Sequence, residues 1–186
     1  MKDFRKHNDK ELIATVAGSG EPDKSAAFSE IYNRYSRKIF LYCRKVADSE
    51  SAADDLFQDT FMQLLKSIEN EVIITNVKGY LLKIARNLAL NMKRVKNPET
   101  VSFEDVKYLF NDNAFESRDL AELVDSALEL LPEEHKEAFI LQAYYGLTYS
   151  EIADVTEVPL STVRNRVVRA KSKLREILTP ILEERN

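Results

Sequence analysis

The sequence predicts an all-α protein made of two helical domains that are joined by a flexible linker. Only four glycines and five prolines occur in 186 residues, and apolar side chains recur at steps of three and four along most of the chain, a spacing that is typical of amphipathic helices. No stretch shows the alternating pattern of a strand, and the one β-prone segment, residues 72–75, is short. We divide the chain into an N-terminal extension (1–23), a first domain (24–97), a linker (98–119) and a second domain (120–186) that contains a helix-turn-helix.

Composition favours a globular protein that does not insert into a membrane. Hydrophobic residues make up 44% and charged residues 31% of the sequence, yet no apolar run approaches the roughly 20 residues that a membrane helix needs. The N-terminal residues lack the apolar core of a signal peptide, so we expect a cytoplasmic protein. The single cysteine, Cys43, excludes an internal disulfide and lies in an apolar run, where a buried thiol is expected.

Three helices are expected in the first domain. The first covers Lys24–Ala47 and carries aromatic and aliphatic residues at helical spacing. The second, Ala52–Ile68, follows a polar turn in which Asp48 or Ser51 can cap it. The third covers Val77–Val95. The second and third helices carry charges of opposite sign, and each charged face is a candidate binding surface.

The third helix has a cationic side, because the chain between residues 72 and 98 contains six basic residues and no acidic one. On a helical wheel the residues of this cationic stripe are Lys83, Arg86, Asn87, Leu90 and Arg94. The wheel gives the opposite, apolar side as Leu81, Ile84, Ala85, Leu88, Met92 and Val95. A cationic stripe in each of two domains indicates a protein that touches nucleic acid at two separate places.

The second helix of the first domain has an acidic face instead. Its members are Asp54, Asp55, Gln58 and Asp59. Two explanations remain open for them. The carboxylates near the start of the helix can stabilise the positive end of its dipole, or the whole face can dock a basic protein partner.

The second domain shows clear helix start and stop signals. A helix is expected over Glu133–Tyr145, and Gly146 can end it because glycine tolerates the left-handed conformation. Thr148 and Glu151 have the spacing of a capping box, which predicts a short helix over Tyr149–Val155. A turn and a second helix follow.

Residues 159–175 carry the strongest functional signal. They hold six basic side chains and no acidic one, in a chain of net charge −4, and such segregated charge indicates a polyanionic partner. Pro159 cannot continue the preceding helix, and Ser161 is expected to cap the next one. The apolar side of that helix consists of Val163, Val167, Ala170, Leu174 and Leu178. The opposite side consists of Ser161, Asn165, Val168, Arg169 and Ser172, with Arg164 and further cations on the flanks.

This layout is the one that a DNA-reading helix needs. Small or planar polar groups can meet base edges in the centre of the face, while the flanking cations meet phosphates. Together with the capped helix before it, the segment predicts a helix-turn-helix whose second helix enters the major groove.

The order of these motifs resembles the extracytoplasmic-function group of bacterial RNA polymerase sigma factors. The resemblance is carried by ADDLFQDTF, GYLLKIARNLALNMKR and LPEEHKEAFIL, followed by YYGLTYSEIADVTEVPLSTVRNRVVRAKSKLR, and extends from about Ala26 to Leu178. It implies a protein that binds core RNA polymerase, brings it to promoter DNA and melts the duplex. In the turn, Glu157 replaces the glycine that is frequent in the family, which costs about 1 kcal/mol if that position is left-handed.

The resemblance also implies roles for the candidate residues. The acidic face would bind core polymerase. The loop Glu69–Val77 would hold a flipped base, which is why we do not interpret it as a strand, and the resemblance implies an anti-sigma protein as a regulatory partner. Contacts to the −10 element would come from Asn76, Lys83, Arg86, Asn87 and Arg94. Contacts to the −35 element would come from Arg164, Asn165, Val168 and Arg169, with Ser161 and Thr162 near phosphates and Ser172 on the same face.

Two other classes of protein fit the sequence less well. A stand-alone helix-turn-helix regulator with a sensor domain would need neither the cationic stripe nor the acidic face of the first domain. An enzyme would need a nucleophile, a base and an orienting group, but we can assemble no such set. The chain has two histidines, His7 and His135, one cysteine, Cys43, and no metal-binding or phosphate-loop motif. His135 lies at a polar helix start, where we expect it to be solvated. We therefore predict no catalytic residue, cofactor or metal site.

Overall fold

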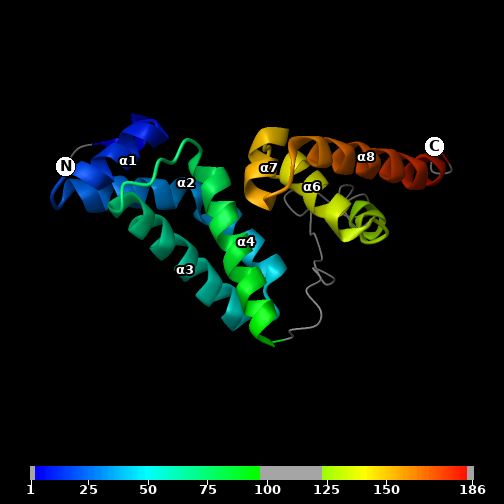
Figure 1. The fold of residues 1–186 in the computed structure, drawn as a ribbon, viewed down its shortest axis with the longest axis horizontal. Helices are drawn as coiled ribbons and strands as arrows, with labels where there is room; N and C mark the ends of the chain where they lie inside the picture. The colour runs from blue at the N-terminus through cyan, green and yellow to red at the C-terminus, as the bar shows by residue number, and fades with distance from the viewer. Residues whose placement is uncertain (1–2, 97–122, 184–186) are drawn as a thin grey trace. The chain divides into compact units, whose positions relative to one another are not determined.

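The computed structural model describes residues 3–96 and 123–183, and every regular element in these two ranges is a helix (Figure 1). This confirms the predicted fold class. The chain divides into two compact units, Met1–Val101 and Ser102–Asn186. The predicted linker (98–119) lies wholly outside the described residues, and our four domain boundaries stay predictions.

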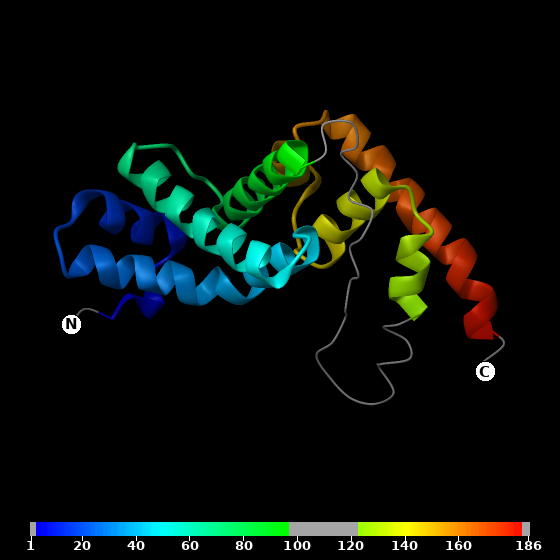
Figure 2. The same ribbon diagram turned by 90° about the horizontal axis from the view of Figure 1, so that it is seen from below.

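The first unit packs four α-helices and a short 3-10 helix. These are η1 (Phe4–Lys6), α1 (Asp9–Gly18), α2 (Asp23–Val46), α3 (Glu50–Glu69) and α4 (Val77–Lys96). Helix α1 lies beside the N-terminal half of α2, while α3 and α4 pack on α2 and on each other (Figures 1 and 2). The fully buried side chains at their centre include Leu12, Ile31, Ile39, Leu56, Leu64, Leu81 and Leu82.

Arg34 of α2 fastens the N-terminal extension to the rest of the first unit. Its guanidinium donates to the main-chain oxygen of His7 at 2.7 Å and forms ion pairs with Asp9 at 3.1 Å and Glu30 at 2.8 Å. The buried Phe4 ring packs against the His7 ring, with their centroids 5.1 Å apart. Residues 4–18 are therefore an integral part of the helical unit.

The cap of α3 differs from our prediction by one or two residues. Ser49, and neither Asp48 nor Ser51, caps the helix, because its backbone is extended and its hydroxyl oxygen accepts a hydrogen bond from the Ala52 N–H at 3.2 Å. Ser51 lies inside the first turn. Several good capping residues stand next to one another here, and only the backbone conformation distinguishes them.

The packed side of α4 is also turned relative to the predicted one. Leu82 and Ala89 are buried, whereas Leu88 and Met92, which we expected on the apolar side, are only half-buried. The helix packs against both α2 and α3, so a broader arc of its surface is covered than a single apolar stripe suggests. The side chain of Val95 lies outside the described residues.

The second unit contains a helix over residues 123–129, followed by α6 (Glu133–Ala143), α7 (Tyr149–Thr156) and α8 (Leu160–Glu183). Helices α6 and α7 both pack on α8. Buried side chains at these contacts include Leu128, Leu141, Ile152, Val163, Val167, Ala170 and Leu174. The capping box of α7 is confirmed, with the Thr148 N–H donating to the Glu151 carboxylate at 2.7 Å and the Glu151 N–H donating to the Thr148 hydroxyl oxygen at 3.3 Å.

The residues after α6 and at the start of α8 test two further predictions, for Gly146 and for Ser161. Gly146 has a φ of 63°, which confirms its left-handed conformation, although α6 ends at Ala143, two residues before the predicted end at Tyr145. The prediction that Ser161 caps α8 is wrong, since α8 begins at Leu160. The carbonyl of Pro159 accepts the N–H groups of Thr162 and Val163 at 2.9 and 3.1 Å, so proline starts the helix and leaves the Ser161 side chain exposed.

Among the described residues we find neither a membrane-spanning helix nor a metal site. No helix there is apolar and long enough to cross a bilayer, and no group of three His, Cys, Asp or Glu side chains could hold a metal ion. Cys43 is fully buried, as predicted, and burial raises the pKa of its thiol to about 12. Its thiol is therefore protonated and shielded at neutral pH.

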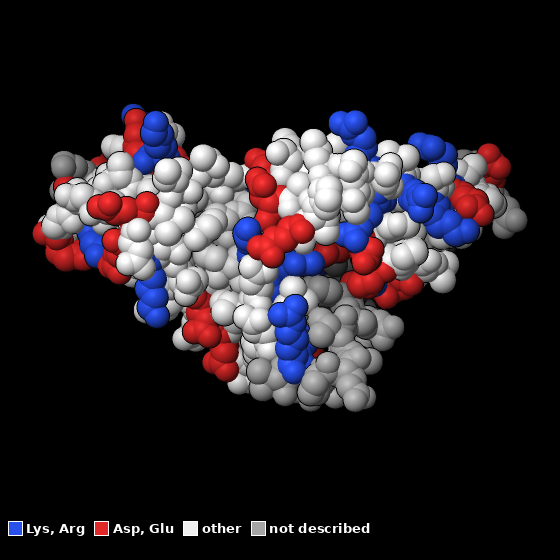
Figure 3. Space-filling model, in the orientation of Figure 1, with Lys and Arg blue, Asp and Glu red and all other residues white. Residues whose placement is uncertain are grey.

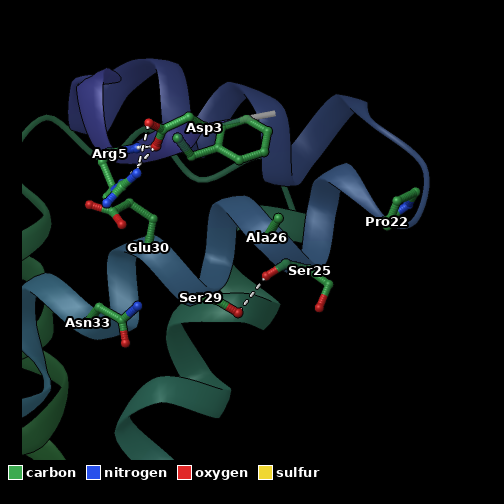
Figure 4. Close-up of a pocket in the computed structure, with 9 residues that line it drawn as sticks. Asp3, Arg5, Pro22, Ser25, Ala26, Ser29, Glu30 and Asn33 are labelled. Atoms are coloured by element: carbon green, nitrogen blue, oxygen red, sulfur yellow. Dashed lines mark hydrogen bonds and ion pairs between the residues drawn. The ribbon is translucent and has the colours of Figure 1, made fainter. Parts of the chain in front are cut away.

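A cavity of about 590 Å³ opens between η1 and the first turns of α2 (Figure 4). At its rim Asp3 and Arg5 form an ion pair at 2.9 Å, and inside it the Ser29 hydroxyl donates to the Ser25 carbonyl at 2.8 Å. The side chains of Asp3, Arg5 and Ser29 thus interact with one another or with the backbone. The lining does not bring together a nucleophile and a base, so its geometry does not suggest a catalytic site.

Candidate nucleic-acid and protein interfaces

Helix α8 separates its apolar and polar sides as the sequence predicts. Val163 and Val167 are fully buried, whereas Val168 is 56% exposed. Of the candidate DNA-contacting residues on this helix, Ser161, Arg164, Asn165, Val168, Arg169 and Ser172 are exposed and Thr162 is half-buried. Figure 3 shows basic side chains along α8. The helix therefore presents a polar, cationic outer face on a firmly packed base.

The turn before α8 has the left-handed backbone at Glu157 on which the predicted cost of replacing glycine depends. Glu157 is left-handed, with φ of 58° and ψ of 36°. A non-glycine residue in this region bears a steric cost of about 1 kcal/mol. At the end of α7 the buried Thr156 hydroxyl donates to the Ile152 carbonyl at 2.7 Å. The turn thus keeps the helix-turn-helix geometry despite the glutamate.

One cation of α8 is held against the neighbouring helix. The Arg166 guanidinium lies 2.6 Å from the Glu134 carboxylate in the first turn of α6, and its side chain is only 17% exposed. Glu134 is followed by His135, which we expected to be solvated but which is half-buried. Burial lowers the pKa of His135, and so do the nearby charges of Arg169 and Arg166. Sequence reasoning missed this neighbourhood because it depends on how α6 packs against α8.

A buried lysine fixes the same turn of α6. Lys136 is 2% exposed, and its ammonium group lies 3.1 Å from the Glu129 carboxylate and 3.2 Å from that of Glu133. Burial raises the pKa of Glu133, while the neighbouring ammonium of Lys136 opposes that rise. Because removing one partner of a buried ion pair leaves an uncompensated charge, this network holds the start of α6 in place.

The candidate residues on α4 are less accessible than those on α8. Lys83, Arg86 and Asn87 are half-buried, and Arg94 is exposed. Asn76 has a structural role at the start of this helix, because its side-chain oxygen accepts the Gly79 N–H at 3.1 Å. A Cβ atom on Gly79 would lie 3.1 Å from the Asn76 amide nitrogen, so glycine lets the cap approach closely.

The loop between α3 and α4 is fixed at its first end and exposed in its middle. Glu71 is left-handed, with φ of 56°. Its N–H donates to the Ile68 carbonyl, and the next N–H, of Val72, donates to the Ser67 carbonyl, both at 3.0 Å. These are the hydrogen bonds of a Schellman motif. Ile73 is 90% exposed, and no residue of the segment is in a strand, which agrees with our interpretation of it as a loop.

Tyr80 joins α4 to α3 rather than facing solvent freely. It is half-buried, and its hydroxyl donates to the Ser67 hydroxyl oxygen at 3.0 Å. Ser67 in turn donates to the Gln63 carbonyl at 2.8 Å. This chain of hydrogen bonds ties the N-terminal part of α4 to the C-terminal part of α3.

The acidic face of α3 is exposed along its whole length, at Asp54, Asp55, Gln58 and Asp59. It is bordered by an aromatic cluster from α2 and α3. Its rings are those of Tyr32, Phe40, Phe57 and Phe61, with centroids 4.9 to 5.9 Å apart. Tyr32 and Phe40 are 39% and 37% exposed. Carboxylates next to partly exposed rings are a surface that could bind a protein with both basic and apolar groups.

Comparison with known proteins places both units in one family. The model of sigma-70 region 2 matches residues 31–98, and that of sigma-70, region 4 matches residues 121–174. The RNA polymerase sigma-H factor of Pseudomonas aeruginosa is 31% identical over 173 residues, which cover 85% of this chain and 89% of that protein. The ECF RNA polymerase sigma-E factor of Haemophilus influenzae is 28% identical over 184 residues, covering 91% and 96%.

A solved structure agrees with this at the level of the fold. The sigma factor RpoE of Bartonella quintana, solved with the anti-sigma factor NepR, superposes with a TM-score of 0.63 at 21% identity, covering 82% of this chain and 96% of that one. The two family matches together span more than half of the described chain. The chain belongs to the sigma-70 family: it is an extracytoplasmic-function RNA polymerase sigma factor, a non-enzymatic protein that directs transcription initiation.

Proposed function

We propose that the outer face of α8 reads the −35 element of the promoter. The observation that carries this proposal is the clean division of the helix, with Val163 and Val167 fully buried and Arg164, Asn165 and Arg169 exposed. Planar amides and guanidinium groups can bond to base edges, and the remaining cations can neutralise phosphates. Ser161, Thr162, Val168 and Ser172 would complete this surface.

We propose that α4 and the loop before it take the −10 element. Opening a duplex costs a few kcal/mol for each base that leaves the stack, and the sequence contains no ATP-binding motif, so binding energy must drive it. Support comes from a loop anchored at both ends beside a basic helix. Its candidate contacts are Asn76, Lys83, Arg86, Asn87 and Arg94.

The acidic face of α3 is our proposed contact with core polymerase. The dipole explanation accounts only for carboxylates in the first turn, and the acidic residue there is Glu50. The carboxylates of the acidic face all lie further along the helix and are exposed. A basic polymerase surface would complement these charges.

The site of action and the regulation follow from the family. We infer that the protein acts in the cytoplasm, where bacterial RNA polymerase transcribes DNA. The matched RpoE was crystallised in complex with the anti-sigma factor NepR, and we propose that an anti-sigma protein also binds this chain.

Replacing Arg169 by alanine tests the role of α8. We expect binding of a mapped promoter to weaken by about 1–3 kcal/mol, with relaxed preference at one or two positions of the −35 element. The measurement is run-off transcription from a library randomised at that element. Lys10→Ala is the control for the loss of one exposed cation, because Lys10 lies on α1 in the other unit. An unchanged sequence preference in Arg169→Ala would refute the assignment.

Reversing a charge on α3 tests the polymerase contact. Asp55→Arg should lower affinity for core polymerase while the free protein stays folded, and Gln58→Ala should have a smaller effect in the same direction. Competition against a second sigma factor measures this affinity. Gln63→Arg controls for added positive charge on the same exposed helix. A stand-alone regulator would not form a one-to-one complex with core polymerase in the first place.

A further inference from the structure

The first turn of α6 lies against the proposed DNA-reading helix. The link is the ion pair between Glu134 and Arg166, whose charged atoms are 2.6 Å apart. His135 directly follows Glu134, and Arg169 follows Arg166 by three residues, so it projects from the same side of α8. The exposed guanidinium of Arg169, which we assign to DNA binding, lies close enough to the half-buried imidazole of His135 for its charge to act on the ring.

The charges around His135 come from two helices. Arg169 and Arg166 of α8 disfavour its protonated form, Glu134 of its own helix favours it, and burial adds to the disfavour. The balance lowers the pKa of the imidazole below its ordinary value of 6.5. The ring is thus mainly neutral at neutral pH. Its protonated form would be stabilised only when an anion, such as a DNA phosphate, binds next to it.

We propose that His135 is a further DNA contact, which binds a backbone phosphate beside the base read by Arg169 and takes up a proton from solvent as it does so. This inference rests on the proposed role of α8. The phosphate brings a negative charge that offsets both guanidinium groups, so the repulsion that keeps the ring neutral is removed. The imidazolium then donates a charge-assisted hydrogen bond to a phosphate oxygen.

The sign of the pH effect follows from this proton uptake. A group that binds a proton more tightly in the complex than in the free protein strengthens binding as the pH falls. The effect is limited to one proton, and so to at most about tenfold in affinity for each pH unit. It should lie between the lowered pKa of the free protein and the higher pKa of the complex.

The test uses the full-length chain and a fluorescent duplex that this chain has selected from a random library. Fluorescence anisotropy at constant ionic strength gives the affinity from pH 5.5 to 8.0. We expect about threefold to tenfold tighter binding at the acidic end, and a flat profile for His135→Gln. His7→Gln is the matched control, because His7 is the only other histidine of the chain. The proposal is overturned if the wild-type profile is flat or if His135→Gln keeps the wild-type slope.

A second measurement locates the phosphate and separates this inference from the function it rests on. Uncharged methylphosphonates are placed one at a time in the duplex. At one position the methylphosphonate should abolish the pH dependence of wild-type binding and should cause no further loss of affinity in His135→Gln. If no position has this effect, the inference is contradicted. If Arg169→Ala weakens binding while His135→Gln changes nothing, only the histidine contact is wrong. If neither variant has an effect, the proposed role of α8 fails as well.

Discussion

Helices α4 and α8 carry similar basic sequences but present them in different ways. The candidate residues of α8 are exposed apart from Thr162, whereas those of α4 are half-buried apart from Arg94. Both helices pack against two others, α8 against α6 and α7 and α4 against α2 and α3, but α8 buries one narrow apolar stripe whereas α4 buries a broader arc. A helix that enters a groove must project from its domain. A surface that captures an unpaired strand can instead be broad and set beside a loop.

Both helices are preceded by a left-handed glutamate, yet the connections differ in length. Glu71 ends α3 and leaves residues 72–76 before α4, whereas Glu157 leaves only two residues before α8. The longer connection exposes Ile73 almost completely. The same backbone device therefore builds a tight turn in one unit and a protruding loop in the other.

The largest effect should come from placing a charge on the buried side of α4 or of α8. Val167→Asp buries an unpaired carboxylate and should destabilise the second unit by several kcal/mol, abolishing −35 binding but not capture of a single-stranded −10 oligonucleotide. Ala85→Asp, under α4, should have the opposite pattern. Thermal unfolding by circular dichroism and oligonucleotide binding measure both effects. Val168→Asp is the matched control, since Val168 is exposed and its change should weaken DNA binding without unfolding. Loss of both activities in each variant would show that the units do not act separately.

Removing the cap of α4 should have the next largest effect. Asn76→Ala deletes the acceptor of the Gly79 N–H and should cost about 0.5–2 kcal/mol of stability, together with weaker binding of the unpaired −10 strand. Asn76→Asp keeps a capping oxygen, so it should restore stability while its negative charge still weakens DNA binding. Chemical denaturation of the full-length chain and strand binding separate the two roles. If Asn76→Asp binds the strand as well as the wild type, Asn76 is only a helix cap.

The sequence was sufficient for features that depend on local pattern. Periodicity located α2, α3, α4, α6 and α7 to within about two residues, and residue type identified the capping box at Thr148 and the left-handed Gly146. It failed where neighbouring residues compete, as at Ser49, or where two partners cover a helix, as at Leu82 and Ala89 of α4. The surroundings of His135 were also beyond reach, because they are set by the docking of α6 on α8 and leave no local signal.

The left-handed glutamates offer a smaller, symmetrical test of the two connections. Glu71→Gly and Glu157→Gly should each stabilise the protein by about 0.5–1 kcal/mol, since glycine avoids the Cβ clash but loses more backbone entropy on folding. Gly146→Ala makes the reverse change at a φ of 63° and should destabilise by a similar amount. Urea denaturation measures all three. A loss of stability in either glutamate variant would mean that its side chain makes contacts that outweigh the strain.

Breaking the ion pair between Glu134 and Arg166 should have the smallest effect on stability, and it tests directly whether Arg166 of α8 is kept away from DNA. Glu134 is 68% exposed, so a double-mutant cycle with alanine should yield a coupling of about 0.2–1 kcal/mol. If the pair holds Arg166 away from DNA, Glu134→Gln should free a cation and steepen the salt dependence of DNA binding by about one phosphate contact, a slope change near 0.9. An unchanged slope with measurable coupling would mean that Arg166 only joins α6 to α8. The ion pair would then add to the apolar packing that holds α8 against α6, as the broader buried arc holds α4 in the first unit.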